Sequence, residues 1–189
     1  MWKQDIRLAG SGGQGLGLAA MVLAEAALTA KLHVTTLQSY GPEARGGASR
    51  SDITMSDQEI ANPWFSQPTL LLALNQKAWA KFGASLLKGA AAVVDCDWVG
   101  GIDLPGVYAL PLERIARNEL REKIAANMVA VGALAVLLER IPLDILRDSA
   151  EKKAPKGFSR INKQAIERGW QLMEETKGGV TGGRGVRGA

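Results

Sequence analysis

The sequence predicts an α/β fold: an open, mostly parallel, Rossmann-like sheet with helices on both faces and a helical C-terminal part. Six short strand patterns alternate with helical ones, which is typical of such sheets. The pattern at 69–74 is a continuous apolar run of the kind that a strand buried on both faces requires, and 90–96 is another buried-strand pattern. A glycine-rich turn at 10–15 connects the first strand pattern to the first helical one.

The strand patterns differ in character along the chain. The first covers 5–9, and the second, 33–38, is rich in β-branched residues. In the third, 48–55, Ile53 and Met55 alternate with Asp52 and Thr54, which predicts a strand exposed on one face. The remaining strands are expected at 69–74, 90–96 and 106–110.

Helical patterns fill most of the remaining sequence. They are expected at 16–30, at 76–88 before Gly89, at 112–117, at 120–140 before Pro142, and at 158–176. Residues 178–189 are mostly glycine and are expected to form a disordered tail. We therefore expect one domain over 1–177.

Composition and charge exclude several classes of protein. A chain of 189 residues with 47% hydrophobic and 22% charged residues is globular and fits one domain. Three cations, Lys177, Arg184 and Arg187, account for most of the net charge of +4, and removing them leaves +1. With 5% aromatic residues as well, neither a basic groove nor a stacking platform for nucleic acid is indicated.

Targeting signals and membrane spans are not expected either. Glycines and polar residues interrupt the first 30 residues, unlike the apolar core of a secretory signal. The apolar stretch 124–138 is shorter than the roughly 20 residues that span a bilayer. A cytoplasmic protein is expected, with no membrane partner.

The chain has a single cysteine, Cys96, and a single histidine, His33. This excludes a disulfide framework and a multi-thiolate metal site, since an iron–sulfur cluster needs about four cysteines. Cys96 lies in an apolar strand pattern, which predicts a small buried hydrophobe. A structural role is expected for His33, and no metal site is predicted.

The turn Gly10-Ser-Gly-Gly-Gln-Gly15 fits the G-x-G-x-x-G pattern of dinucleotide-binding folds. Such a site also needs an acidic residue at the end of the second strand, about 20 residues further on, to hold the ribose. The sequence there reads Leu37-Gln-Ser-Tyr40, without a carboxylate. A glycine turn can also serve only close strand-to-helix packing, so both interpretations remain open at this point.

A second glycine-rich turn follows the second strand, Ser39-Tyr-Gly-Pro-Glu-Ala-Arg-Gly-Gly47. In a parallel sheet both turns emerge at the carboxyl edge, where ligands bind. Gln14, Tyr40, Glu43 and Arg45 could therefore face one crevice.

These two turns, together with Ile60-Ala-Asn-Pro63 and the strand closed by Asn75, resemble the gamma subunit of 2-oxoacid:ferredoxin oxidoreductases. The resemblance continues in Asn127-Met-Val-Ala-Val-Gly132 and in Asn162-Lys-Gln-Ala165 with Gly169. The turn at 40–47 is more similar to the 2-oxoglutarate branch of this family than to the pyruvate branch.

The resemblance implies a subunit, inactive alone, of a complex that decarboxylates a 2-oxoacid to an acyl-CoA and passes electrons to ferredoxin. It implies partner subunits of alpha, beta and ferredoxin-like delta type, which carry thiamine diphosphate, Mg²⁺ and [4Fe-4S] clusters. Coenzyme A needs a phosphate-binding loop but no acidic residue that holds the ribose hydroxyls. A glycine turn without such a carboxylate after the second strand fits these requirements.

We accordingly expect this chain to contribute to the coenzyme A site and to close the active site. The expected residues are Gly12, Gly13, Gln14, Gly15, Tyr40, Glu43, Arg45, Gly46, Gly47, Asn75 and Asn127. Arg45 suits a phosphate or a substrate carboxylate because its guanidinium is a planar fork of donors. The alternatives are an NAD(P)- or flavin-binding oxidoreductase and a non-catalytic scaffold subunit whose apolar contacts include Trp64, Phe65 or Trp79.

Overall fold

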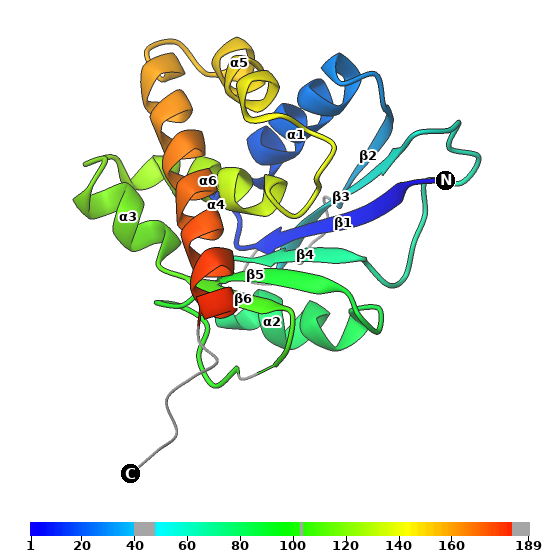
Figure 1. The fold of residues 1–189 in the computed structure, drawn as a ribbon, viewed down its shortest axis with the longest axis horizontal. Helices are drawn as coiled ribbons and strands as arrows, with labels where there is room; N and C mark the ends of the chain where they lie inside the picture. Colours follow the sequence, from blue (N-terminus) through cyan, green and yellow to red (C-terminus); the bar gives the residue numbers. More distant parts are fainter. Residues whose placement is uncertain (40–47, 103, 183–189) are drawn as a thin grey trace.

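The computed structural model describes residues 1–39, 48–102 and 104–182. Within them a six-stranded sheet has the order β2-β3-β1-β4-β5-β6 (Figure 1). The strands are β1 (Lys3–Gly10), β2 (His33–Ser39), β3 (Ser49–Ser56), β4 (Leu70–Ala73), β5 (Ala91–Asp95) and β6 (Val107–Leu110). All six predicted strands are present within two residues of their expected bounds.

Strand pairing is parallel on one side of β1 and antiparallel on the other. β1, β4, β5 and β6 run parallel, whereas β3 is inserted antiparallel between β1 and β2. Gly10 pairs with Ser49, and Ser39 pairs with Arg50, so β1 and β2 end at the same edge of the sheet. The predicted α/β class and mostly parallel sheet are confirmed.

The prediction that the third strand is exposed on one face is wrong. Asp52, Thr54 and Ile53 are all buried, although successive side chains point to opposite faces of β3. Thr54 donates a hydrogen bond to the Asp5 carboxylate at 2.8 Å, and Asp52 accepts two from Arg7, each at 2.8 Å. The polar positions of the alternation are thus internally paired rather than solvated.

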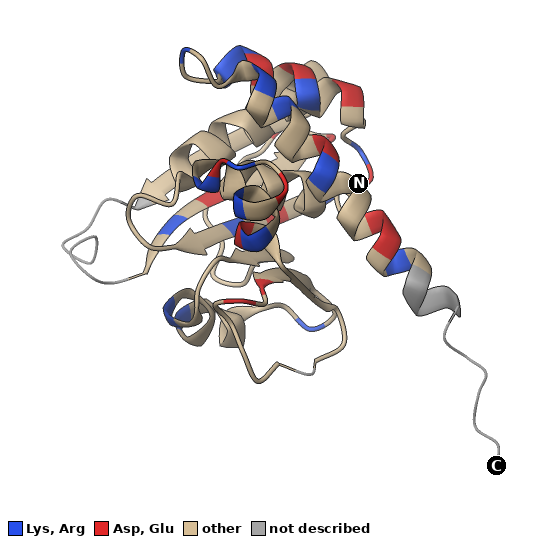
Figure 2. Cartoon of the chain, turned by 90° about the vertical axis from the view of Figure 1, so that its left-hand side faces the viewer, with Lys and Arg blue, Asp and Glu red and all other residues tan. Residues whose placement is uncertain are grey.

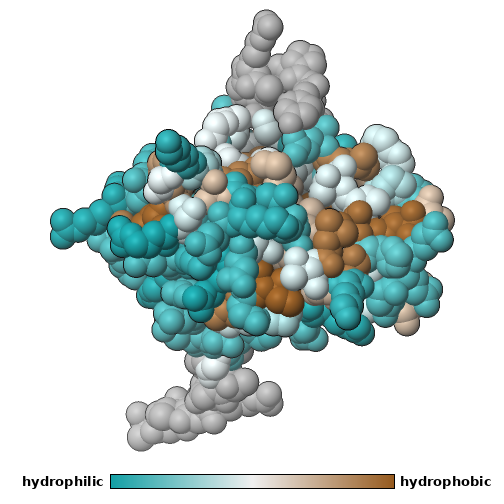
Figure 3. Space-filling view, turned by 90° about the horizontal axis from the view of Figure 1, so that it is seen from above, coloured by the Kyte–Doolittle hydropathy of each residue, from teal (hydrophilic) through white to brown (hydrophobic). Residues whose placement is uncertain are grey.

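Helices cover the two faces of the sheet unequally (Figure 1). The helices are α1 (Leu16–Thr29), α2 (Gln76–Phe82), α3 (Leu112–Asn118), α4 (Ala126–Ala135), α5 (Leu143–Lys153) and α6 (Ser159–Gly182). The larger apolar core joins one face of the sheet to α1, α3, α4, α5 and α6, and the smaller core lies under α2. Seen from above, the surface is mainly hydrophilic with separate apolar patches (Figure 3).

Several helix predictions need correction. The single helix expected at 120–140 is a 3₁₀ turn, Lys123–Ala125, followed by α4. Positive φ angles of 56° at Arg121 and 59° at Glu139 take the backbone out of the right-handed helical region on either side. The helix expected at 76–88 ends at Phe82 and continues as the 3₁₀ turn Gly83–Ser85.

Two C-terminal features also differ from expectation. Helix α5 was not predicted; three of its residues, Leu146, Ser149 and Ala150, are buried. Helix α6 continues past the expected end at 176 to Gly182. The rest of the glycine tail, 183–189, lies outside the described residues, and its disorder stays a prediction.

Helices α4 and α6 pack through two glycines. A Cβ on Gly132 would overlap the carbonyl oxygen of Ile166, and a Cβ on Gly169 would overlap that of Val129. The two backbones can approach this closely because neither glycine carries a side chain. This contact explains why both positions are glycine within otherwise regular helices.

Ion pairs connect α5 to its neighbours. Basic and acidic residues are interspersed along the outer helices (Figure 2). Arg147 pairs with Glu167 of α6 at 2.9 Å. The carboxylate of Glu25 on α1 forms ion pairs with Lys152 and with Lys153, the latter at 3.0 Å. Hydrogen bonds from Lys152 and Lys153 lower the pKa of Glu25 below its ordinary value of 4.5.

This lowered pKa predicts a pH-dependent contribution to stability. A carboxyl with a depressed pKa stabilises the fold above its unfolded-state pKa, and this contribution disappears as pH falls through the folded-state value. Glu25→Gln should therefore be less stable than the parent near pH 7 and equally stable in acid. Urea unfolding over a pH series measures the difference, with exposed Glu174→Gln as the control; a difference independent of pH would contradict the prediction.

Two further expectations have structural outcomes. Cys96 follows β5 directly and is only half-buried, with its thiol near Asp97 and Arg114, so it is not the fully buried hydrophobe expected.

Among the described residues, no helix is both long enough and apolar enough to cross a membrane. Trp64 is 69% exposed, whereas Phe65 lies against Arg7.

Candidate functional site

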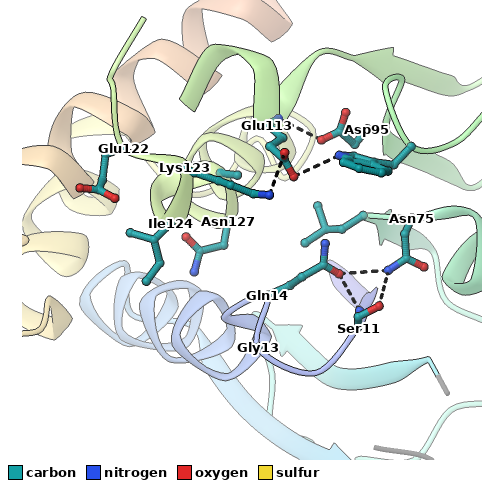
Figure 4. A pocket seen from close by; sticks show the side chains of 13 residues that line it. Ser11, Gly13, Gln14, Asn75, Asp95, Glu113, Glu122, Lys123, Ile124 and Asn127 are labelled. Carbon is teal, nitrogen blue, oxygen red and sulfur yellow. Dashed lines mark hydrogen bonds and ion pairs between the residues drawn. The ribbon is translucent and has the colours of Figure 1, made fainter. Parts of the chain in front are cut away.

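A cavity of about 630 Å³ opens at the carboxyl edge of the sheet, where β1, β4 and β5 end (Figure 4). The segments after these three strands contribute one wall, and the start of α3 and the turn before α4 contribute the other. Its lining residues are Ser11, Gly13, Gln14, Leu74, Asn75, Asp95, Trp98, Glu113, Glu122, Lys123, Ile124, Ala126 and Asn127. Ligands of open α/β sheets bind at this edge.

The glycine turn is closed by the side chain of Gln14. Its Oε1 accepts hydrogen bonds from the backbone N–H of Ser11 at 2.6 Å and from Asn75 Nδ2 at 3.0 Å. The side chain fits over Gly10, where a Cβ would lie 2.5 Å from that oxygen. The carbonyl end of Gln14 is thereby fixed, and its Nε2 donor group points into the cavity (Figure 4).

Asn75 links this turn to the next strand. Its Oδ1 accepts a hydrogen bond from the N–H of Ala78 at 2.9 Å and caps α2. Its Nδ2 donates to Ser11 Oγ at 3.0 Å as well as to Gln14. Asn75 therefore fixes the position of the glycine turn relative to β4 and α2.

Asn127 holds the other end of the turn. It is only 5% exposed, and its Nδ2 donates to the carbonyl oxygen of Gly15 at 3.2 Å. A Cβ on Gly15 would overlap this Nδ2, and the φ of 73° at Gly15 is in the left-handed region. Asn127, which was expected at the coenzyme A site, lines the cavity and satisfies a backbone carbonyl that precedes α1.

The N-terminus of α1 has the properties of an anion site. Gly15 is its N-cap residue, no side chain forms a capping hydrogen bond, and the first turn contains no acidic residue. The unpaired N–H groups and the helix dipole favour a phosphate or a carboxylate at this position.

The opposite end of the cavity is acidic and was not predicted. Asp95 ends β5, and its carboxylate accepts hydrogen bonds from the N–H groups of Glu113 at 2.9 Å and Asp97 at 3.1 Å. Burial raises the pKa of Asp95. Glu113 pairs through Oε1 with Lys123 at 3.2 Å and accepts a hydrogen bond through Oε2 from Trp98 Nε1 at 3.1 Å.

The structure brings together only part of the predicted site. Gly13, Gln14, Asn75 and Asn127 line one cavity, and Gly12 and Gly15 belong to the same turn. The residues expected from the second turn, Tyr40, Glu43, Arg45, Gly46 and Gly47, lie outside the described residues. The described residues contain no group of three or more His, Cys, Asp or Glu side chains that could hold a metal ion.

Comparison with known proteins identifies the family. Residues 5–172 match the family model described as pyruvate ferredoxin/flavodoxin oxidoreductase. The chain belongs to this family. The resemblance seen in its two glycine turns is thus confirmed over nearly the whole sequence.

Two relatives within the family are subunits of similar length. The chain is 36% identical to 2-oxoglutarate synthase subunit KorC of Methanocaldococcus jannaschii, over 92% of this chain and 95% of that subunit. The KorC subunit of Methanothermobacter thermautotrophicus is 35% identical, over 92% of this chain and 96% of that one.

Solved structures of family members have the same fold. The gamma subunit of a keto/oxoacid ferredoxin oxidoreductase from Geobacter sulfurreducens matches with a TM-score of 0.81 and 35% identity, over 91% of this chain and 99% of that one. The 2-oxoglutarate:ferredoxin oxidoreductase of Magnetococcus marinus, solved with 2-oxoglutarate, coenzyme A and succinyl-CoA bound, matches with a TM-score of 0.79 and 26% identity. That match covers 93% of this chain and 32% of the longer one.

Proposed function

We propose that this chain is the gamma subunit of a 2-oxoacid:ferredoxin oxidoreductase that converts 2-oxoglutarate to succinyl-CoA with electrons passed to ferredoxin. The family match and the identity to KorC subunits over most of both chains support this proposal. The subunit contributes to the coenzyme A site and to closure of the active site, and it has no complete activity alone.

The observation that carries the proposal is the convergence of Gln14, Asn75 and Asn127 around the glycine turn in one cavity. Backbone N–H groups at the start of α1 and the Nε2 of Gln14 are the donors for the pyrophosphate of coenzyme A. In this proposal Arg45 supplies the charge that a phosphate or the substrate carboxylate needs, and Tyr40 and Glu43 contribute to the mouth of the site. Gly12, Gly46 and Gly47 allow close backbone approach to the ligand.

The redox and decarboxylation chemistry belongs to partner subunits in this proposal. One cysteine in 189 residues does not suffice for a [4Fe-4S] cluster, so the clusters, thiamine diphosphate and Mg²⁺ are assigned to alpha-, beta- and delta-type partners. This chain binds and orients the acyl acceptor and excludes water from the site.

Gln14→Glu tests the coenzyme A assignment with little change of shape. Glutamate keeps the oxygen that accepts from Ser11 and Asn75 but replaces the Nε2 donor with a negatively charged oxygen. In the assembled complex the KM for coenzyme A should rise about 10- to 100-fold, since a hydrogen bond to a charged group is lost and repulsion replaces it. The KM for 2-oxoglutarate should stay unchanged, and Gln171→Glu, exposed on α6, is the control of equal charge.

Arg45→Ala tests the second turn in the same assay. A rise in the KM for coenzyme A assigns Arg45 to a phosphate, and a rise in the KM for 2-oxoglutarate assigns it to the substrate carboxylate. If neither Gln14→Glu nor Arg45→Ala changes either KM, the scaffold alternative is correct and the site assignment fails.

A further inference from the structure

Ser11 lines the cavity at the glycine turn, although it was not among the predicted site residues. It is exposed, and its Oγ accepts a hydrogen bond from Asn75 Nδ2 at 3.0 Å. A hydroxyl that accepts from an amide still has its own proton to donate. Within the described part of the chain this proton has no acceptor, so the hydroxyl can donate to a ligand in the cavity.

The amide of Asn75 sets the direction of this hydrogen bond. Its Oδ1 accepts from the backbone N–H of Ala78 at 2.9 Å, which turns its Nδ2 toward the glycine turn. Both hydrogens of that Nδ2 are used, one for Ser11 Oγ and one for Gln14 Oε1 (Figure 4). Asn75 thus has no donor left for a ligand and acts on it only through Ser11 and Gln14.

The rest of the glycine turn has the same polarity. Gln14 Oε1 accepts from the N–H of Ser11 and from Asn75, which leaves the Nε2 donor of Gln14 for the cavity. The backbone N–H groups of Gly12 and Gly13 make no hydrogen bond to any of the described residues. Hydroxyl, amide and backbone donors that converge on one space recognise an oxyanion.

We propose that Ser11 donates a hydrogen bond to an oxygen of the coenzyme A pyrophosphate, and that Asn75 is the positioning residue that turns this hydroxyl toward the ligand. The assignment rests on the proposed function. Because a hydroxyl that accepts a hydrogen bond is polarised and becomes a stronger donor, Asn75 also strengthens the contact between Ser11 and the phosphate.

Ser11→Ala tests the contact in the assembled complex, since it removes the hydroxyl but keeps the backbone N–H that binds Gln14. The kcat/KM for coenzyme A should fall roughly 10- to 150-fold, the range for a lost hydrogen bond to a charged group. Dephospho-coenzyme A, which lacks only the 3′-phosphate, should show the same loss. Pantetheine, which has the same thiol arm without a phosphate, should show none, and the KM for 2-oxoglutarate should stay unchanged. Ser66→Ala, at an exposed serine outside the cavity, is the control.

Asn75→Asp tests the positioning role. Aspartate keeps an oxygen that can cap α2 but has no N–H for Ser11, so the hydroxyl proton of Ser11 turns toward the new carboxylate. The kcat/KM for coenzyme A should fall, and adding Ser11→Ala should then have little further effect, because the hydroxyl no longer faces the ligand. If the two losses are additive, Asn75→Asp acts through its charge alone and the positioning role is wrong. Thermal unfolding of each complex shows whether the variants remain folded.

The outcomes separate this assignment from the proposed function. If Gln14→Glu raises the KM for coenzyme A but Ser11→Ala has no effect, or affects pantetheine equally, the Ser11 assignment is wrong and the coenzyme A site stands. A loss with coenzyme A but not with dephospho-coenzyme A would overturn the assignment to the pyrophosphate, and so would a raised KM for 2-oxoglutarate. If Gln14→Glu, Arg45→Ala and Ser11→Ala are all without effect, the coenzyme A site itself is wrong.

Discussion

Asp52→Ala is expected to lower the free energy of unfolding by about 3–5 kcal/mol, the range for breaking one side of a buried ion pair. The side chains of Arg7 and Asp52 are 3% and 8% exposed, and two hydrogen bonds of 2.8 Å join them. The guanidinium also lies 5.2 Å from the ring centroids of Phe65 and Phe82. Removing the carboxylate leaves the Arg7 cation enclosed between aromatic rings, and it also removes the partner that Arg50 contacts at 3.7 Å.

Urea unfolding of the purified chain measures this effect. Asp148→Ala, an exposed position on α5, is the matched control and should change stability by less than about 0.5 kcal/mol. The double variant Arg7→Met with Asp52→Leu should recover much of the loss, because apolar replacements of buried pairs are often neutral. A loss below about 1 kcal/mol in Asp52→Ala would mean that Arg7 finds another partner or reaches water.

Gly169→Ala is expected to cost about 3 kcal/mol, at the upper end of the range for an overpacked core. The new Cβ would overlap the carbonyl oxygen of Val129, and the backbone nitrogen of Ala133 lies 3.0 Å from the same position. These are backbone atoms within α4, so no side chain can rotate away and the two helices must separate. Because Asn127 stands at the start of α4, this separation should also weaken its hydrogen bond to Gly15.

Gly178→Ala is the matched control on the same helix. Nothing lies within 4 Å of its Cβ position, so alanine should be neutral or stabilise α6 by up to about 1 kcal/mol through helix propensity. Thermal or urea unfolding compares the two variants, and the KM for coenzyme A reports any movement of Asn127. Equal effects of the two substitutions would show that α4 and α6 do not depend on the glycine contact.

The sequence predicts the strands well because their signals are local. Apolar runs, β-branched residues and the glycine turn identify β1, β2, β4 and β5 without knowledge of their neighbours. The position of β3 is not local, since nothing in its alternation reveals that a strand flanks it on each side. The exposure of Asp52 and Thr54 was therefore mispredicted, because their partners, Arg7 and Asp5, lie on β1.

The same distinction applies to the candidate site. Gln14 and Asn75 were predicted because Gln14 lies in the glycine turn after β1, Asn75 closes the apolar run of β4, and both belong to the motifs of the family resemblance. Asp95 has the same signal as the last residue of β5, so sequence reasoning had the means to find it. Glu113 and Trp98 are separated by 15 residues, and they meet because the N–H of Glu113 donates to Asp95 at the end of β5, which no local pattern reveals.

The hydrogen bonds that shape the glycine turn are made by amide side chains: Gln14, Asn75 and Asn127. None of these groups gains or loses a proton between acid and alkaline solution. The geometry of the turn is therefore the same at any pH at which the chain stays folded. A pH profile of coenzyme A binding would consequently report on the carboxylates at the opposite end and on the phosphates of the ligand itself.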